Sequence, residues 1–383
     1  MMILIRDSLR LLVLALQRIR HRLVVRVRFI NTSSLQEQRI HAYPVDPEDM
    51  PLAAEFFARS NIYRSRPVVK FSREEAGIYR FGHGISIHEA RFIRFQEDTL
   101  IDVGQQSREP LSILRKPFAK KPTEERKRLL MPWDGGGASY GDFIIKVLPK
   151  LSRLLDAMPA VARGDYDVCL PHFHQCTWAV EYLALMGIDK ARILDGTTTI
   201  LVPEGGELIL GMGPQLGHGI AHPSDIRAMM RRLNSSVPPP PVNPWRKIYI
   251  SRKTGRKMLN EDELICGLRE RNFEIIHLEE LSLGGQIKLF QESAVIAGPH
   301  GAGHANIIWS SPGAQLLEVF HPSWMHPSYA ILSGILGIGY HCLVGHKDDK
   351  KGSWTEKSRY GIFEDPSIDP EVFFRKLDTL SKQ

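Results

Sequence analysis

Short apolar runs alternate with amphipathic segments through the C-terminal half of the chain. The pattern predicts strands at 247–250, 273–277, 294–297 and 315–320, and helices at 261–271 (capped by Asn260), 283–292 and 305–310. Strand and helix in strict alternation predict a parallel sheet with helices on both faces. The fold class predicted for this half is therefore α/β.

The N-terminal half shows the same alternation less cleanly. The pattern predicts strands at 167–170, 191–194 and 200–202, and a helix at 176–186. Four consecutive prolines at 238–241 cannot donate to a sheet, and we interpret the surrounding segment as a stiff linker. The domains expected are an N-terminal domain at 31–236 and a C-terminal domain at 245–383, joined by the linker 237–244. The last helix either completes the C-terminal domain or packs back on the N-terminal one.

Residues 1–30 are apolar and basic, with seven arginines against one acid, Asp7. Their longest charge-free stretch, 11–17, is far shorter than the ~20 apolar residues of a membrane-spanning helix. A secretory signal would need an apolar core of ~7–15 residues followed by small residues at a cleavage site, and here the core is minimal and arginines follow it. A helix that lies on an anionic membrane surface explains the segment. The first helix and strand of a domain, with alternation at 25–29, explain it equally well.

Composition narrows the classes of function. The chain has 383 residues, of which 43% are hydrophobic and 24% charged, as in an ordinary two-domain globular protein. Most of the net charge of +7 lies in the first thirty residues, and the basic run at 115–128 is interrupted by Glu124, Glu125 and two prolines, which disfavours nucleic-acid binding. The four scattered cysteines contain no CxxC pair and favour a reducing, cytoplasmic compartment.

The segment most informative about function is 294–320, where a buried strand runs into a glycine-rich turn. The turn contains His300, Gly301, Ala302 and Gly303 and opens a helix at about residue 304. Small residues let backbone N–H groups approach an anion, and a helix N-terminus adds partial positive charge, so a phosphate group is the expected ligand. Glycine needed only for the packing of a tight turn is an equally good interpretation.

Charged side chains follow two other predicted strands. Arg252 comes directly after the strand 247–250, with Lys253 and Arg256 close behind. A planar guanidinium matches phosphate oxygens two at a time. Glu318 closes the strand 315–320, at the position where doubly wound sheets place an acid for ribose hydroxyls. Solvated charges on a turn, and an ion pair of Glu318 with a helix or on the surface, are the simpler alternatives.

Together these residues resemble glycosyltransferase family 61, an HGAG-containing family with members in capsular polysaccharide synthesis. The resemblance rests on YISR at 249–252, NEDEL at 260–264, Gln286, GPHGAG at 298–303, Asn306, Pro312-Gly313 and Glu318. It implies a GT-B fold, with two Rossmann-like domains facing across a cleft, a nucleotide-sugar donor (usually a UDP-sugar), inversion at the anomeric carbon and no metal cofactor. The donor-binding residues it suggests are Arg252, Arg256, Gly301, Ala302, Gly303, Asn306 and Glu318, with His300 shaping the donor pocket.

The segment 139–149 matches the family less well, because Asp142 stands where the family has histidine and Lys146 where it has an acid. Inverting transfer requires a group that takes the proton of the acceptor hydroxyl, and Asp142 is our candidate for this general base. We expect Asp142 and His300 to be the catalytic residues. A helix cap with Ser139 explains Asp142 equally well.

Three further residues are candidates for the acceptor side, namely Tyr140, His172 and His174. The two histidines follow the strand 167–170 at its carboxyl end, but without a third ligand they give little support for a metal site. The DxD pattern at 165–167 lies at the amino end of that strand and is interpreted as a turn. We therefore predict no metal site. His321 and His326 are expected to line the cleft.

The sequence thus predicts a metal-independent, inverting glycosyltransferase that adds a sugar to a growing cell-surface polysaccharide or a lipid-linked glycan. The expected location is cytoplasmic and peripheral, at the inner face of the cell membrane. A catalytically inactive nucleotide-sugar-binding scaffold of the same pathway is the alternative, because of the altered segment 139–146. A phosphatase or kinase is a third, although no nucleophile or metal-binding carboxylate pair is evident.

Overall fold

The structure is a computed structural model, and it describes seventeen stretches of the chain. They are residues 28–30, 39–42, 50–51, 68–69, 77–82, 85–88, 92–95, 99–102, 123–132, 139–159, 164–170, 176–195, 198–212, 220–253, 255–322, 325–346 and 365–381. The predictions for residues 1–27, His172 and His174 lie outside these residues. The chain divides into two compact units, one of residues 1–45, 72–138 and 146–214, the other of residues 46–71, 139–145 and 215–383.

The first unit contains two six-stranded sheets. The mixed sheet has the order β1 (Arg28–Ile30), β8 (Thr99–Asp102), β7 (Phe92–Phe95), β6 (Ile85–His88), β13 (Thr199–Val202) and β9 (Glu124–Glu125). The other has the order β12 (Ile193–Asp195), β11 (Asp167–Leu170), β10 (Arg128–Met131), β14 (Glu207–Met212), β5 (Gly77–Phe81) and β2 (Arg39–Ala42), and is parallel from β12 to β14. Helices α5 (Leu148–Ala157) and α7 (Thr177–Leu185) belong to the same unit. The predictions of a strand at 167–170 and a helix at 176–186 are confirmed.

The predicted strand at 191–194 begins two residues later, at Ile193. Its first residues belong instead to the 3-10 helix η5 (Lys190–Arg192), because the side chain of Asp189 accepts a hydrogen bond from the N–H of Ala191 and caps a tight turn.

The second unit is built on a five-stranded, wholly parallel sheet, as predicted. Its order is β16 (Phe273–Ile276), β15 (Arg246–Ile250), β17 (Ser293–Pro299), β18 (Gln315–Phe320) and β19 (Gly339–Val344). The chain moves outward from β15 to β16 and then returns past β15 to β17. The strand order therefore reverses between β15 and β17, and ligands of doubly wound sheets bind beyond the carboxyl ends of the strands at such a point.

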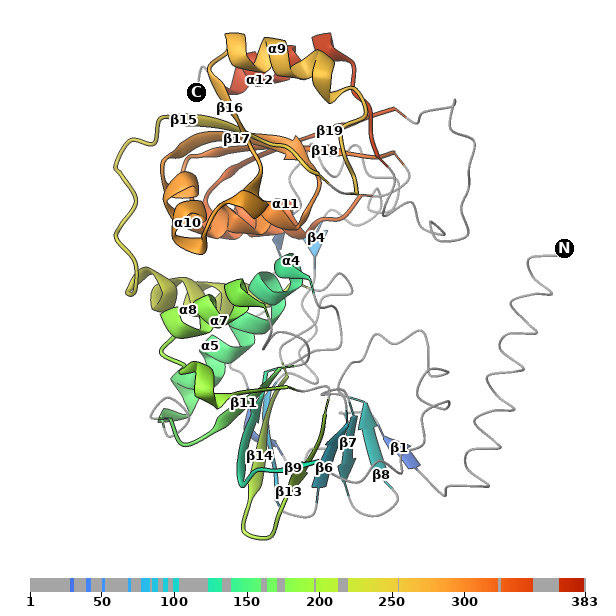
Figure 1. Ribbon diagram of the computed structural model, residues 1–383, viewed down its shortest axis with the longest axis vertical. Coiled ribbons are helices and arrows are strands. Elements are labelled where there is room, and N and C mark those ends of the chain that lie inside the picture. Colours follow the sequence, from blue (N-terminus) through green and yellow to red (C-terminus); the bar gives the residue numbers. More distant parts are fainter. Residues whose placement is uncertain are drawn as a thin grey trace, which may run out of the picture. The chain divides into compact units, whose positions relative to one another are not determined.

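Helices cover both faces of this sheet (Figure 1). α9 (Glu261–Glu270) and α12 (Pro370–Leu380) lie on one face, and α10 (Leu283–Gln291) and α11 (Ser328–Leu336) on the other. η7, a 3-10 helix at Ala302–Trp309, contacts α10, α11 and α4 (Tyr140–Asp142). The remaining elements are the short 3-10 helix η6 (Leu278–Glu280), α8 (Pro223–Asn234), the two-stranded sheet of β3 (Met50–Pro51) and β4 (Val68–Val69), and the π-helix η3 (Phe143–Val147), which runs from the second unit into the first.

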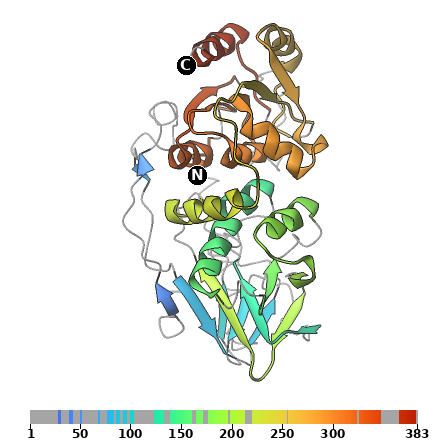
Figure 2. The same cartoon turned by 90° about the vertical axis from the view of Figure 1, so that its left-hand side faces the viewer.

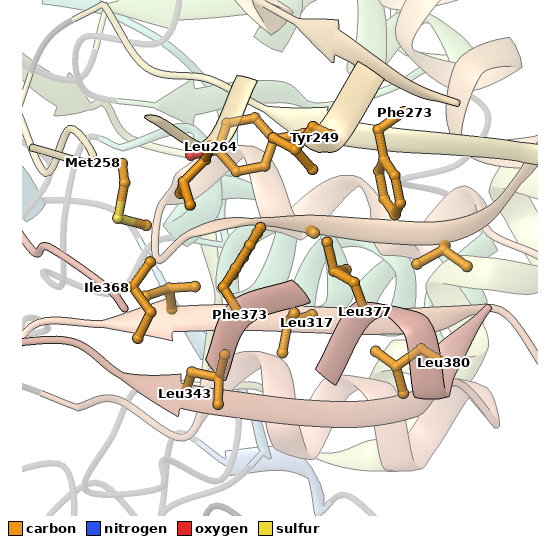
Figure 3. Close-up of a cluster of buried hydrophobic side chains, with 14 residues drawn as sticks. Tyr249, Met258, Leu264, Phe273, Leu317, Leu343, Ile368, Phe373, Leu377 and Leu380 are labelled. Atoms are coloured by element: carbon orange, nitrogen blue, oxygen red, sulfur yellow. The ribbon is translucent and has the colours of Figure 1, made fainter. Parts of the chain in front are cut away.

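The last helix completes the core of the second unit. Phe373 and Leu377 of α12 join Leu264 of α9 and Tyr249 and Leu317 of the sheet in one buried apolar cluster (Figure 3). The ring of Phe373 meets that of Tyr249 edge to face, with 6.3 Å between centroids. α9 and α12 lie on the same side of the sheet in the turned view as well (Figure 2). The last helix thus packs on α9 and the sheet of the second unit.

Two local predictions need correction or refinement. The helix predicted at 305–310 is a 3-10 helix that begins three residues earlier, at Ala302. Asn260 occupies the cap position of α9, but its side chain makes no cap hydrogen bond and pairs with the backbone of Ile368 at 2.8 and 3.1 Å. The proline segment 237–244 is grouped with the second unit, where the carbonyl of Pro238 accepts a hydrogen bond from the side chain of Gln291, and its role as a linker stays a prediction.

The fold is thus mixed α/β, and the GT-B arrangement implied by the family resemblance stays a prediction. Among the helices of the described stretches, none has both the length and the apolar character needed to cross a membrane.

Candidate functional site

The candidate site lies in the second unit, where the strand order reverses. Strand β15 ends at Ile250, and the hydroxyl of Ser251 donates to the carboxylate of Glu261 at 2.8 Å, which ties the strand end to the start of α9. Arg252 follows, and its Nε donates to the carbonyl of Gly255 at 2.8 Å. Gly255 has a φ of +53°, a conformation that suits glycine. The charge of Arg256 acts on Arg252, so the two guanidinium groups lie near each other.

The turn after β17 is built to receive the Arg252 side chain. A Cβ atom at Gly301 would collide with Arg252 Nη1 and would lie 2.8 Å from its Cζ. Gly303 is packed against Leu278, whose Cδ1 would lie 2.6 Å from a Cβ atom there. Both interpretations of the glycines therefore have support, since one glycine serves packing and the other makes room for a cation. The prediction that Arg252 lies beside the glycine-rich turn is confirmed.

Arg252 and Arg256 are both partly buried and lie close enough for their charges to interact. Burial lowers the pKa of Arg252, and the nearby charge of Arg256 lowers it further. Burial also lowers the pKa of Arg256, with partial compensation from Tyr329 and Glu318. Two like charges held together out of full solvent contact are stabilised by an anion. The first N–H groups of η7 have no acceptor within the helix and lie at the same turn.

His300 and Glu318 meet at the carboxyl ends of β17 and β18. In the sheet register Glu318 lies opposite Gly298, and His300 stands two residues beyond on the same face. His300 Nδ1 contacts Glu318 Oε1, and the hydroxyl of Tyr340 on β19 donates to Glu318 Oε2 at 2.6 Å. Glu318 is fully buried. Its carboxylate is thus engaged by two protein side chains, and its predicted contact with a ribose stays a prediction.

Burial governs the protonation of this pair. It raises the pKa of Glu318 to about 7, against the lowering effects of Tyr340 and neighbouring positive groups. It lowers the pKa of His300 well below the usual range, and the charges of Arg256 and Arg252 add to this effect. A buried carboxyl and a buried imidazole in contact therefore share protons as one unit.

A second hydrogen-bonded group fixes the start of α4 against the same turn. The hydroxyl of Tyr140 donates to Asn306 Oδ1 at 2.5 Å, and Asn306 Nδ2 donates to Gln286 Oε1 at 2.9 Å. Gln286 Nε2 donates in turn to the carbonyl of Leu278 at 2.9 Å. Asn306 is fully buried. Tyr140, predicted for the acceptor side, thus bonds to the turn region, and three residues of the sequence pattern are brought together.

Asp142 is part of a helix cap. The Ser139 hydroxyl accepts a hydrogen bond from the N–H of Asp142 at 3.1 Å and donates to its carboxylate at 2.7 Å. A Cβ atom at Gly141 would lie 2.9 Å from the Tyr329 hydroxyl and 3.4 Å from the Cα of Ala302. The cap interpretation is therefore confirmed, and α4 rests on the glycine-rich turn and on α11. The role of Asp142 as general base stays a prediction.

The other candidate residues are placed as follows. His326 Nδ1 lies 2.7 Å from the hydroxyl of Ser328, and its ring centroid is 6.5 Å from that of His300, so it lies near the site. His321 is buried at the end of β18. The turn before β11 is present as predicted, and Asp167 pairs with Arg126 at 3.3 Å. In the stretches that the structure describes, no three His, Cys, Asp or Glu side chains gather as a metal site would require.

The sequence reasoning missed two residues of the site. Tyr340 holds Glu318, and Tyr329 of α11 lies 5.5 Å from His300 between ring centroids. The alternating segment at 339–344, which forms β19, carries the signal that was available for Tyr340.

The Glycosyltransferase 61 family model matches residues 140–317. This range is a little under half of the chain, and it runs from Tyr140 through Arg252 and the turn at 300–303. It contains the Tyr140–Asn306 hydrogen bond and ends one residue before Glu318. The match supports a glycosyltransferase and leaves open whether the chain is of the capsular type.

Curated relatives agree with this class of enzyme. The chain is 23% identical over 104 residues to a beta-1,2-xylosyltransferase of Arabidopsis thaliana, covering 24% of this chain and 20% of that protein. It is 26% identical over 154 residues to an EGF domain-specific O-linked N-acetylglucosamine transferase of Drosophila melanogaster, covering 38% and 29%. A beta-1,2-xylosyltransferase of Oryza sativa subsp. japonica is 27% identical over 63 residues, covering 16% and 12%. The alignments thus span less than a third of each relative.

Proposed function

We propose that the protein is an inverting glycosyltransferase that transfers a sugar from a nucleotide-sugar donor, a UDP-sugar, to a glycan acceptor. The main support for the proposal is the position of Arg252. Its guanidinium lies against Gly301 and near Arg256, at the point where the strand order reverses. This arrangement of two guanidinium groups and a helix N-terminus suits a diphosphate. The family match and the names of the relatives support sugar transfer as the reaction.

In the proposed reaction an acceptor hydroxyl oxygen attacks the anomeric carbon of the donor sugar. The bond from that carbon to the β-phosphate oxygen breaks on the opposite side, and the nucleoside diphosphate leaves with the electron pair. The hydroxyl proton passes to the carboxylate of Asp142, the general base of the proposal. Arg252, Arg256 and the N–H groups at the start of η7 stabilise the negative charge that grows on the leaving diphosphate.

We also propose that the reaction needs no metal ion. In many phosphate sites a divalent cation neutralises the diphosphate charge, and here two guanidinium groups would supply that positive charge. A chelator should then leave activity unchanged, and a divalent cation added after chelation should not raise it. A strict requirement for a cation would contradict this part of the proposal.

The proposal is tested by ligand binding and by donor turnover. A panel of UDP- and GDP-sugars should contain one that raises the melting temperature of the purified protein, because a ligand that binds the folded state stabilises it. The same donor should be hydrolysed slowly in the absence of acceptor. Failure of every nucleotide sugar and of free UDP and GDP to bind would overturn the proposal.

A catalytically inactive scaffold that binds nucleotide sugars is the second candidate. It is favoured by the capping contact of Asp142 with Ser139, which gives this carboxylate a structural task. Donor binding without hydrolysis or transfer to any glycan acceptor would support the scaffold. Transfer that depends on Asp142 would exclude it.

For the acceptor we propose a growing cell-surface polysaccharide or a lipid-linked glycan, with the protein cytoplasmic and peripheral at the inner membrane face. The positive charge of residues 1–30 supports the proposed location at the membrane face. Deletion of residues 1–20 should abolish sedimentation with vesicles that contain anionic lipid, and salt should weaken the binding of the intact chain. Equal sedimentation of the intact and shortened chains would contradict it.

A further inference from the structure

Three polar side chains of the second unit, His300 directly after β17, Glu318 of β18 and Tyr340 of β19, form one buried chain of contacts. Glu318 receives the Tyr340 hydroxyl on one carboxylate oxygen and contacts His300 Nδ1 with the other. Glu318 is fully buried and His300 is 7% exposed, so solvent screens neither group. The proposed reaction gives this contact no task, although it lies directly beside the turn that would hold the diphosphate.

The imidazole ring of His300 is held in place on several sides. It stacks on Phe320 with 5.0 Å between ring centroids, and the rings of Tyr329 and His326 lie at 5.5 and 6.5 Å. A ring packed in this way keeps Nδ1 on Glu318. The hydrogen-bonding character of the other nitrogen, Nε2, is then set by the protons on the pair and not by rotation of the ring.

The number of protons on the pair decides whether Nε2 of His300 is a hydrogen-bond donor or an acceptor. When the pair is deprotonated, the Glu318 carboxylate accepts from Nδ1–H of His300, and Nε2 carries a lone pair. When one proton is added, either the Glu318 carboxyl donates to Nδ1 or His300 is an imidazolium. In both arrangements Nε2 carries a hydrogen. One proton therefore converts Nε2 from a hydrogen-bond acceptor into a donor.

We propose that His300 and Glu318 act as one proton-holding pair, which takes up a proton when a nucleoside diphosphate binds beside Arg252 and Arg256. This inference rests on the proposed function, because it needs a diphosphate at that site. Without the ligand, burial and then the charges of Arg256 and Arg252 lower the pKa of His300 and so disfavour an extra proton on its ring. A bound diphosphate neutralises them and adds negative charge near His300, so the protonated pair becomes the stable form. Glu318 is then a positioning residue that acts through His300.

The surroundings of the pair set the pH range in which the uptake is visible. The titratable and charged groups that face it are Arg252 and Arg256 after β15, His304 of η7, His326 and Tyr329 beside α11, and Tyr340 of β19. Since burial raises the pKa of Glu318 to about 7, the empty pair holds its proton below that pH and has lost it above. The number of protons taken up when the nucleoside diphosphate binds is therefore small at pH 6 and approaches one near pH 8. Affinity falls with rising pH in that range, by up to about tenfold per unit.

Calorimetric titration with UDP at pH 8, in two buffers of different ionisation enthalpy, measures the number of protons taken up. We expect about one for the wild-type protein and about none for Glu318→Gln, since a glutamine amide keeps the size, can accept from the Tyr340 hydroxyl and donate to His300 Nδ1, and does not titrate. The matched control is Glu280→Gln, which changes an exposed carboxylate paired with Lys253 and should leave the uptake unchanged.

A second variant keeps the test open if Glu318→Gln does not fold. Tyr340→Phe removes a hydrogen bond that lowers the pKa of Glu318, so the curve of uptake against pH should move to higher pH. Three results would contradict a proton-holding pair. They are UDP binding by the wild-type protein without proton uptake at pH 8, equal proton uptake in the wild type and Glu318→Gln, and an unchanged curve of proton uptake against pH in Tyr340→Phe. Failure of UDP and GDP to bind at all would overturn the diphosphate site itself, and would thus be distinguished from a failure of the pair alone.

Discussion

The guanidinium of Arg252 occupies the space into which any side chain at residue 301 would project. Gly301 has an extended backbone with a φ of −175°, a conformation open to every residue. The requirement for glycine at this position therefore comes from the neighbouring cation and not from backbone strain. A strand end and a turn some fifty residues apart in the sequence are in this way made to fit each other.

Gly301→Ala should fold normally and bind UDP at least about tenfold more weakly. The added methyl group displaces the guanidinium, and each charge-assisted hydrogen bond to a phosphate contributes roughly 1.5–3 kcal/mol. Calorimetric titration measures the loss. Gly284→Ala is the control, because a Cβ atom at Gly284 would meet nothing within 4 Å. Equal affinity in the two variants would contradict the fit between Arg252 and Gly301.

Arg252→Ala should weaken UDP binding by more than about tenfold, and Arg252→Lys should recover only part of the loss. Lysine restores the charge but not the planar pair of donors that matches two phosphate oxygens. The adjacent Lys253→Ala is the control, since Lys253 is exposed and pairs with Glu280, and its affinity should stay within about twofold. Equal losses of UDP affinity in Arg252→Ala and Lys253→Ala would indicate a general charge effect and not a specific contact of Arg252 with the diphosphate.

The sequence was sufficient to predict the parallel sheet because its strands and helices are separate in the pattern. The β18 strand at Gln315–Phe320 was predicted to the residue. The placement of Arg252 beside the turn also followed, because the carboxyl ends of parallel strands meet at one edge. The contacts of Glu318 could not be predicted from the sequence. Its partners His300 and Tyr340 are set by the register of three strands, and a single sequence does not encode that register locally.

The start of η7 shows a further limit of sequence reasoning. The apolar pattern at 305–310 indicates a helix, but not that it is a 3-10 helix from Ala302. Its first turn is set by tertiary contacts. Among them are the close approach of Gly141 to Ala302 and the contact of Gly301 with the guanidinium of Arg252. Contacts between segments distant in the chain decide such details, and helix periodicity does not report them.

Tyr140→Phe should lower the free energy of unfolding of the second unit by about 1–2 kcal/mol. The variant leaves Asn306, which is fully buried, without the hydrogen bond from the tyrosine hydroxyl. A double-mutant cycle in urea with Gln286→Ala should give a coupling of about 0.5–3 kcal/mol, since the two residues share Asn306. The same cycle with Val372→Ala, at an exposed site on α12, should be additive. Additivity in both cycles would contradict the hydrogen-bonded group.

Asp142→Asn separates the two tasks that this carboxylate has in the proposed enzyme. Asparagine cannot take up the acceptor proton, so we expect transfer to fall by about 10²–10⁴-fold while UDP affinity is unchanged. Ser139→Ala is the matched control, because it removes the cap hydrogen bonds and keeps the carboxylate. It should cost about 1 kcal/mol of stability and slow transfer far less. Initial rates with the donor found in the thermal-shift panel, together with melting curves of both variants, check these outcomes. Undiminished transfer by Asp142→Asn would leave Asp142 as a cap alone and would require another group as the base.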